Sequence, residues 1–297
     1  MIEISSTDTT LDTVLPFQVD GLGVRGRFVR LAEVARPVVA DARYPAPVAS
    51  LVLETLVLTA LLASVLKYEG VFSLQIQGDG PISLLVADIT SEGDMRAYAK
   101  FDDAALSRTT AETEGLLPHL VGAGHMAFTV DQGPDTERYQ GITELSGTTL
   151  CECASAYFRQ SEQLDTLIVS AAGTEGAAGV MIQRLPSSEF ELDEAQEAWR
   201  EAALLAGTLG DEELLDIGLP PADLLFRLYH ERGVRVYGTE NLHYSCRCSR
   251  ERVSQTLASF PRAELTDMLD DGAISITCEY CGTDYAFGEA DLDGLFS

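Results

Sequence analysis

The residues best suited to chemistry in this 297-residue chain are two close pairs of cysteines near its C-terminal end. Cys246 and Cys248 form a Cys-x-Cys pair, Cys278 and Cys281 form a Cys-x-x-Cys pair, and 29 residues separate the two pairs. Thiolate sulfur is a soft ligand, and four thiolates satisfy the tetrahedral preference of zinc. The spacing therefore predicts a four-cysteine zinc site. The same four thiols are also potential disulfide partners, and the residues alone leave both chemistries open.

The charge of the chain is far from balanced, with 47 acidic residues against 20 Lys and Arg and a net charge of −27. Such a surface repels phosphate backbones and anionic lipid, so we expect neither nucleic acid nor membrane as a partner. The hydrophobic fraction of 46% is ordinary for a globular protein and allows a sizeable core.

The first residues are polar and lack the basic start and apolar stretch of a signal peptide, which predicts a cytoplasmic location. Structural disulfides are rare in that compartment, where paired cysteines more often bind metal or act in redox chemistry. Residues 48–66 are almost wholly apolar and imitate a membrane span, but Glu54 interrupts them. We interpret this segment as a helix buried inside a soluble domain.

The pattern of elements predicts an α+β fold in three parts. Residues 1–186 are expected to form a mixed α/β domain, because alternating strands such as 72–77 and 82–88 accompany the long apolar helix. Gly21, Gly23 and Gly26 formally match GxGxxG. A dinucleotide site needs a helix immediately afterwards, whereas residues 27–30 look like strand, so the glycines are interpreted as turn residues.

A second Cys-x-Cys, Cys151 and Cys153, lies on a helix that Thr148 or Thr149 caps and that runs to about residue 163. Residues two apart on a helix point about 200° apart, so these thiols cannot converge on one ion. We interpret them as small buried hydrophobic residues.

Residues 187–241 form the second part, an acidic helical linker. Their short helices carry like charges three and four residues apart, which weakens each helix by a few tenths of a kcal/mol per pair. Docking on a neighbouring surface must supply their stability. The acids are Glu189, Glu191, Asp193, Glu194, Glu197, Glu201, Asp211, Glu212 and Glu213.

Residues 242–297 form the third part, a module with too few apolar residues for an ordinary core. A unit of this size usually needs a metal or a disulfide in order to fold. Zinc contributes roughly 10–16 kcal/mol to the folding of such peptides, and oxidation of the thiolates would remove that contribution. The core residues expected are Val253, Leu257, Phe260, Leu265, Leu269, Ile274, Ile276 and Phe287.

Over nearly its whole length the chain resembles the heat shock protein 33 family, redox-regulated holdase chaperones of the bacterial cytoplasm. The two cysteine pairs and their spacing are the most specific part of this resemblance. Further similar stretches are Cys248-Ser249-Arg250-Glu251-Arg252-Val253, Gln77-Gly78-Asp79-Gly80-Pro81, Tyr139-Gln140-Gly141 and Ser161-Glu162-Gln163.

The resemblance implies a function for each part. Cys246, Cys248, Cys278 and Cys281 would bind one zinc ion per chain in a reduced, inactive protein. Oxidation would form the disulfides Cys246–Cys248 and Cys278–Cys281, release zinc, unfold the module 242–297 and the linker 187–241, and expose apolar surface. The protein would then dimerise and hold unfolding client proteins without ATP, with residues 1–186 as the substrate-binding domain.

Three alternatives follow from the same cysteines. A structural zinc ribbon that mediates interactions needs no redox chemistry, and a nucleic-acid-binding ribbon would use the nearby Arg247, Arg250 and Arg252, against the net charge. A thiol oxidoreductase would use Cys278 and Cys281, but such motifs usually start a helix that follows a strand. No catalytic arrangement of Ser, His and Asp is evident, so the protein is not expected to be an enzyme.

Overall fold

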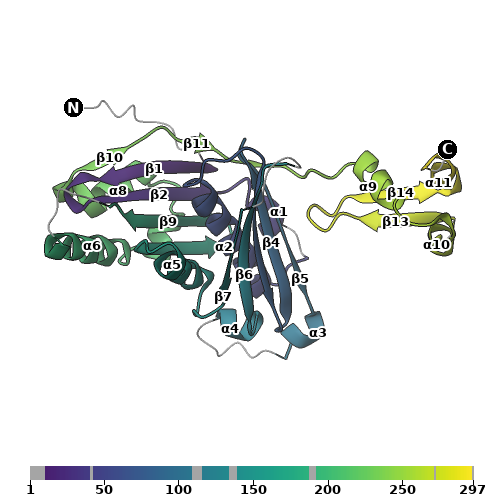
Figure 1. Ribbon diagram of the computed structural model, residues 1–297, viewed down its shortest axis with the longest axis horizontal. Helices are drawn as coiled ribbons and strands as arrows, with labels where there is room; N and C mark the ends of the chain where they lie inside the picture. Colours follow the sequence, from purple (N-terminus) through teal and green to yellow (C-terminus); the bar gives the residue numbers. More distant parts are fainter. Residues whose placement is uncertain are drawn as a thin grey trace. The chain divides into compact units, whose positions relative to one another are not determined.

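A computed structural model describes residues 11–40, 43–108, 116–133, 139–186, 192–270 and 272–295. The chain divides into two compact units, residues 1–244 and residues 245–297. Sheets and helices occur in both units, which confirms the predicted α+β class (Figure 1). The predicted functional division at residues 186 and 241 stays a prediction, and Glu189 and Glu191 lie outside the described residues.

The first sheet of the larger unit is antiparallel and begins with two strands joined by a tight turn. Gly21 and Gly23 lie in that turn, as interpreted from the sequence, whereas Gly26 lies within strand β2, where the Phe17 side chain leaves no room for a Cβ. Gly23 has φ +59°, a left-handed conformation that glycine adopts at no steric cost, and strand rather than helix follows it. The members in spatial order are β10 (Val234–Val236), β1 (Thr13–Val19), β2 (Val24–Leu31), β9 (Gly176–Arg184) and β8 (Thr166–Gly173), with β11 (Glu240–Asn241) also on β1.

The second sheet is built around the predicted hairpin of residues 72–88. Strands β3 and β4 pair in antiparallel register from Val71 opposite Thr90 to Gln77 opposite Leu84. The short strand β12 is parallel to β5, and the other pairings in this sheet are antiparallel. The order is β12 (His243–Tyr244), β5 (Asp94–Phe101), β4 (Ile82–Thr90), β3 (Val71–Gly78), β6 (Gly124–Asp131) and β7 (Tyr139–Glu144).

Helix α2 (Ala46–Ala63) packs against strands of both sheets and supplies the largest share of the central core of any element (Figure 1). By length and composition alone it could cross a membrane, but 72% of it is buried inside the protein, as expected for a core helix. Its one acid, Glu54, accepts the backbone N–H of Cys151 at 3.3 Å, at the N-terminus of helix α5 (Leu150–Ser161). That end of a helix favours negative charge, although burial raises the pKa of Glu54.

Helix α5 confirms the expected cap and the expected separation of its two thiols. Thr149 accepts the N–H of Glu152, and both Cys151 and Cys153 are buried. The Cys151 Sγ lies 3.1 Å from the Ser170 hydroxyl, whereas the Cys153 Sγ accepts the N–H of Gly147. The shorter helices of this unit are α1 (Arg36–Ala40), α3 (Asp103–Leu106) and α4 (Leu116–Leu120).

The linker helices cover the face of the first sheet that points away from α2. Side chains alternate along β2, so Val29 packs in the core with α2 while Phe28 packs with the linker helices. The Tyr229 hydroxyl donates to the carbonyl of Ala202 at 3.0 Å and ties two of these helices together. The linker helices are α6 (Leu192–Ala206), α7 (Asp211–Leu215) and α8 (Pro221–Tyr229).

A buried arginine of the sheet anchors the linker. Arg30 is 3% exposed, and its guanidinium donates to the carbonyl oxygens of Leu219 at 2.9 Å and Leu214 at 3.1 Å. It also lies over the ring of Phe28, 5.2 Å from the centroid. Burial lowers the pKa of Arg30, and the nearby Asp216 opposes that effect. The end of α7 and the loop before α8 therefore depend on a residue far away in sequence.

We expect Arg30→Met to loosen the linker while the sheet stays folded. Two buried carbonyl oxygens would lose their donors, and each unsatisfied acceptor costs about 1–3 kcal/mol. Hydrogen exchange should accelerate in residues 211–229 more than in the central strands. Arg36→Met is the control, because that exposed side chain pairs with the exposed Glu33 on the surface. Equal exchange rates in the two variants would contradict the anchoring role.

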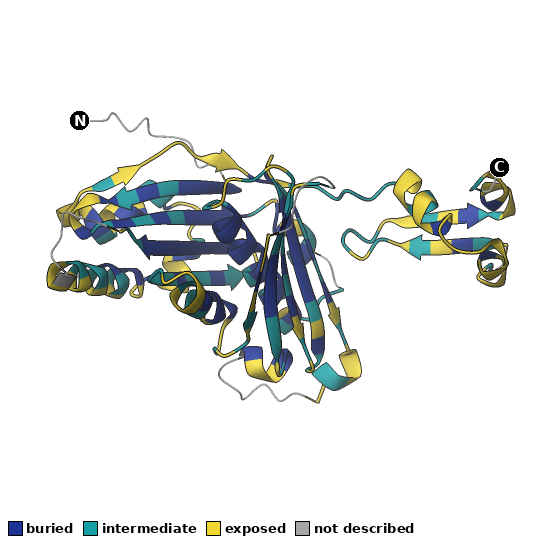
Figure 2. Ribbon diagram, viewed as in Figure 1, coloured by how far each residue is buried: buried dark blue, intermediate teal, exposed yellow. Residues whose placement is uncertain are grey.

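The smaller unit contains a two-stranded sheet and short helices around a few apolar side chains (Figure 2). Its elements are α9 (Arg250–Leu257), α10 (Arg262–Asp267), β13 (Ala273–Thr277), β14 (Asp284–Gly288) and α11 (Glu289–Leu295). The buried core is Leu257, Leu265, Ile274, Phe287 and Leu292.

Two details of the expected core of this unit need correction. Phe260 is 43% exposed instead of buried, because it follows the end of α9 and precedes Pro261 in the turn toward α10. Leu292 on α11 belongs to the core and was not predicted, because an acidic C-terminal stretch gives little sign of a packed helix.

Candidate metal centre

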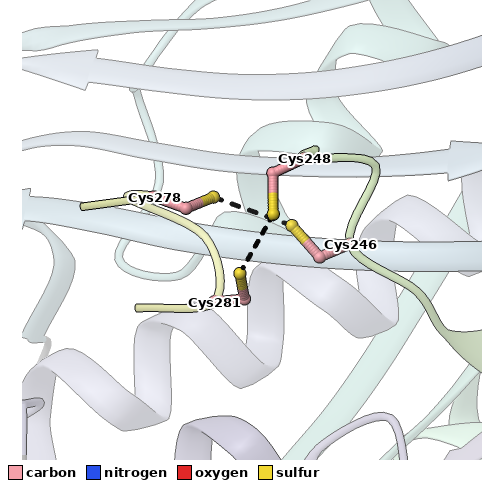
Figure 3. A group of neighbouring side chains, drawn as sticks. All are labelled: Cys246, Cys248, Cys278 and Cys281. Carbon is pink, nitrogen blue, oxygen red and sulfur yellow. Dashed lines mark hydrogen bonds between the residues drawn. The ribbon is translucent and has the colours of Figure 1, made fainter. Parts of the chain in front are cut away.

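The four predicted thiols converge within the smaller unit. Their Sγ atoms all lie within 4.8 Å of one another. Two contacts run between the pairs, 3.7 Å from Cys246 to Cys278 and 3.4 Å from Cys248 to Cys281 (Figure 3). Four sulfurs bound tetrahedrally to zinc at about 2.3 Å stand about 3.8 Å apart. The donor set and its spacing thus fit a metal ion that prefers four thiolates.

The first pair lies in the loop that leads into helix α9. Ser249 follows directly and caps this helix, its hydroxyl accepting the N–H of Arg252 at 3.2 Å. The cap fixes the backbone immediately after Cys248, which is the physical reason for a serine at this position. The similar stretch 248–253 therefore joins a ligand to a helix start.

The second pair lies in the turn between β13 and β14. The N–H of Cys278 donates to the carbonyl of Thr283 at 2.9 Å, and the N–H of Gly282 donates to the carbonyl of Cys278 at 2.8 Å. Gly282 has φ +69°, where a side chain would be strained. The turn directs both sulfurs to the same side (Figure 3).

Two hydroxyl groups that sequence reasoning missed contact the sulfurs. The Tyr285 hydroxyl donates to the Cys248 Sγ at 3.1 Å, and the Thr283 hydroxyl lies 3.2 Å from the Cys281 Sγ. Both residues lie on the chain just after Cys281, so their closeness in sequence was the available signal. Groups of this kind orient metal ligands and tune their basicity.

The pKa values of the thiols diverge. Burial raises the pKa of Cys246 to about 12 and also raises that of Cys278. Burial would raise the pKa of Cys281 as well, but hydrogen bonds from Thr283 and from the neighbouring thiols outweigh it and lower the value to about 6. The hydrogen bond to Cys248 raises the pKa of Tyr285 to about 12, so this residue stays a donor.

Within the described ranges, the four thiols are the one cluster of metal-binding side chains. Cys151 and Cys153 lie in the other unit and do not join it. The expected basic patch is partly neutralised, since Arg250 pairs with Asp291 at 2.9 Å and Arg252 donates to the carbonyl of Arg247. This arrangement gives no support to nucleic-acid binding by the smaller unit.

Comparison with known proteins identifies the family. A family model described as Hsp33 protein matches residues 12–288. The 33 kDa chaperonin of Caulobacter vibrioides is 39% identical in an alignment that covers 96% of this chain and 98% of that protein. The chain belongs to the Hsp33 family. The 33 kDa chaperonin of Photobacterium profundum is 36% identical over 96% of this chain and 95% of its own length.

The Hsp33 fold extends through the whole chain. The crystal structure of the 33 kDa chaperonin from Thermotoga maritima, a heat shock protein 33 homolog, superposes with a TM-score of 0.76. That alignment covers 96% of this chain and 97% of the other at 24% identity, so it supports the fold alone. Family membership places this chain among chaperones and confirms the resemblance expected from the cysteine motifs.

We expect one divalent metal ion per chain, bound through all four thiols. Cobalt(II) added to the reduced protein should give the intense sulfur-to-metal absorption and visible bands of a tetrahedral four-thiolate site. Serine at any of Cys246, Cys248, Cys278 or Cys281 should weaken binding at least tenfold and change the spectrum. Cys153→Ala is the control and should leave both unchanged. An unaltered spectrum in any one of the four serine variants would remove that residue from the ligand set.

Proposed function

We propose that this Hsp33-family chain is a redox-regulated, ATP-independent holdase, reduced and zinc-bound when inactive and activated by oxidation of its four C-terminal thiols. The observation that carries the proposal is the convergence of four oxidisable ligands in a unit with only five core residues among those described. Loss of these ligands would remove much of what holds that unit folded.

The energetics favour metal-dependent folding of the smaller unit. A module of about fifty residues with so few buried side chains has little hydrophobic stabilisation to offset its conformational entropy. Zinc bound to four thiolates adds roughly 10–16 kcal/mol in comparable peptides. Cys246, Cys248, Cys278 and Cys281 would hold one zinc ion, and Thr283 and Tyr285 would orient two of the sulfurs.

Oxidation would convert ligands into disulfides. Formation of each disulfide takes two electrons from two thiols and reduces one hydrogen peroxide to two waters, so two bridges consume two peroxides. The expected bridges are Cys246–Cys248 and Cys278–Cys281. Two sulfur contacts run across the pairs, Cys246 to Cys278 and Cys248 to Cys281, so bridges within each pair would require the sulfurs to move as the metal leaves.

The linker would convert loss of the metal into exposed apolar surface. Its helices carry many acids and cover Phe17, Phe28 and Val180 on the first sheet. Arg30 fastens them to the sheet through two carbonyls, and Arg232 pairs with Glu201 within the linker. A linker that lost these helices would uncover a surface able to hold unfolding client proteins, with residues 1–186 as the binding domain.

Two further elements complete the proposal. The oxidised chain would form a homodimer, because the same uncovered surface is available on every copy. The protein would act in the cytoplasm, where its thiols stay reduced until oxidative stress, and would bind neither nucleic acid nor membrane. No catalytic step is required of any residue.

The activity test compares the reduced and oxidised states directly. Peroxide at elevated temperature should release zinc, which a chromogenic chelator measures. The oxidised protein should then suppress the aggregation of a heat-denatured client without ATP. The variant with serine at Cys278 and Cys281 should not gain this activity on treatment with peroxide. Retained zinc together with no gain in suppression of aggregation would reject the proposal. Activation of the serine variant by oxidant would reject the role assigned to Cys278 and Cys281.

The single tryptophan provides a built-in reporter of the linker. Trp199 lies on α6 and is half-buried against the apolar side chains that pack between the linker helices and the first sheet. Oxidation should expose it, so we expect its emission to shift to longer wavelength at the same rate as zinc is released. A chelator that removes zinc under reducing conditions separates metal loss from disulfide formation. Zinc loss with an unchanged emission spectrum would show that the linker does not respond to the smaller unit.

A further inference from the structure

A partly open, mainly apolar pocket lies in the larger unit where the two sheets and two helices meet. Its volume is about 390 Å³, within the usual range for sites that bind small molecules. The C-terminal ends of α2 and α5 form two walls, and strands β3 and β6 form a third. The apolar lining includes Leu62, Val65, Phe72, Phe128, Tyr157 and Phe158.

The aromatic wall is rigid and closely packed. The rings of Phe128 and Tyr157 meet edge to face with centroids 4.5 Å apart, and Phe72 stacks on Phe128 at 6.4 Å. Gly141 leaves room for this contact, because a Cβ there would lie 2.3 Å from the Phe128 ring. Rings fixed in this way present apolar surface at little cost in conformational entropy.

Two sequence motifs that the thiol chemistry does not use meet at this pocket. Tyr139 belongs to Tyr-Gln-Gly and Glu162 belongs to Ser-Glu-Gln. The Glu162 carboxylate accepts hydrogen bonds from the hydroxyls of Tyr139 at 3.1 Å and Tyr157 at 2.9 Å. Gln163 holds the next position with φ +55°, an uncommon conformation for a residue other than glycine. Among the described residues, Glu162 is the acid in the pocket wall, and two donors already bind it.

Basic side chains also line the pocket. Arg25 and Arg184 line it, and Arg27 on the same strand is close enough for Arg25 to lower its pKa, after the larger effect of burial. Arg184 pairs with Asp165 at 2.8 Å, whereas Arg25 donates to the amide oxygen of Gln183 and pairs with no carboxylate among the described residues. The Arg25 guanidinium is therefore available to an anionic ligand beside an apolar cavity. Such a cation is unusual in a chain of net charge −27.

We infer that this pocket binds a small amphiphile with an apolar body and one carboxylate, such as a medium-chain fatty acid. The chain would lie against the aromatic wall, and the carboxylate would accept hydrogen bonds from the Arg25 guanidinium. A carboxylate suits the planar fork of arginine, and its partial desolvation at the cavity wall strengthens the pair. The site belongs to the reduced, folded larger unit and needs neither zinc release nor linker unfolding.

The test is calorimetric titration of the reduced, zinc-loaded protein with decanoate, decanol and decyltrimethylammonium, each below its micelle concentration. We expect decanoate to bind one per chain, at least tenfold more tightly than decanol, and the cation not to bind. Arg25→Met should weaken the binding of decanoate at least tenfold and leave the affinity for decanol unchanged, while Arg25→Lys should retain most of the affinity for decanoate. Arg159→Met, an exposed arginine on α5 outside the pocket, is the matched control.

A second variant tests the cavity itself. Leu66 is 39% exposed at the pocket, so Leu66→Trp should fill the space without disturbing the buried core, and both decanoate and decanol should lose binding. Thermal unfolding of each variant verifies that it folds. Equal affinities for decanoate and decanol, binding unaffected by Leu66→Trp, or no binding at all would overturn the inference. Zinc retention throughout the titration keeps these outcomes separate from those of the redox proposal.

Discussion

Helix α2 is apolar on nearly every side, and the architecture of the larger unit follows from the need to cover it. A single sheet covers one side of a helix, so two sheets are required, and both pack against α2. This arrangement leaves one face of the first sheet without a partner helix from the core. Its strands carry large apolar side chains on both faces, and only one face is used against α2. The second face needs a cover of its own.

The linker helices cover this second face, and their intrinsic stability is low. Repulsion among their acids and their short length leave them dependent on docking. Arg30 illustrates how that docking is achieved: a charge is buried in the sheet, with its Nε atom unsatisfied among the described residues, in order to hold two carbonyls of the linker. Burial of this kind contributes position more than stability. The anchor thus fixes where the linker lies on the sheet.

The elements that local pattern determines were predictable from the sequence, and the contacts that topology determines were not. Alternation identified β3 and β4, and the spacing of Cys246, Cys248, Cys278 and Cys281 identified the site. Arg30 escaped prediction because a charge in a strand ordinarily marks the solvent face. Tyr285 escaped because its contact with Cys248 depends on the β13–β14 register, in which Ile276 stands opposite Tyr285.

The same division explains why the larger and smaller units suit different chemistry. The smaller unit has a core of only five residues among those described, so a metal held by its four thiols would be a main source of its stability. The core of the larger unit is built around α2, and its aromatic pocket is held by side-chain packing and by the two tyrosines on Glu162. A ligand bound there would stabilise the two sheets against each other. It would leave the thiols untouched, so the binding domain would stay intact while its cover is lost.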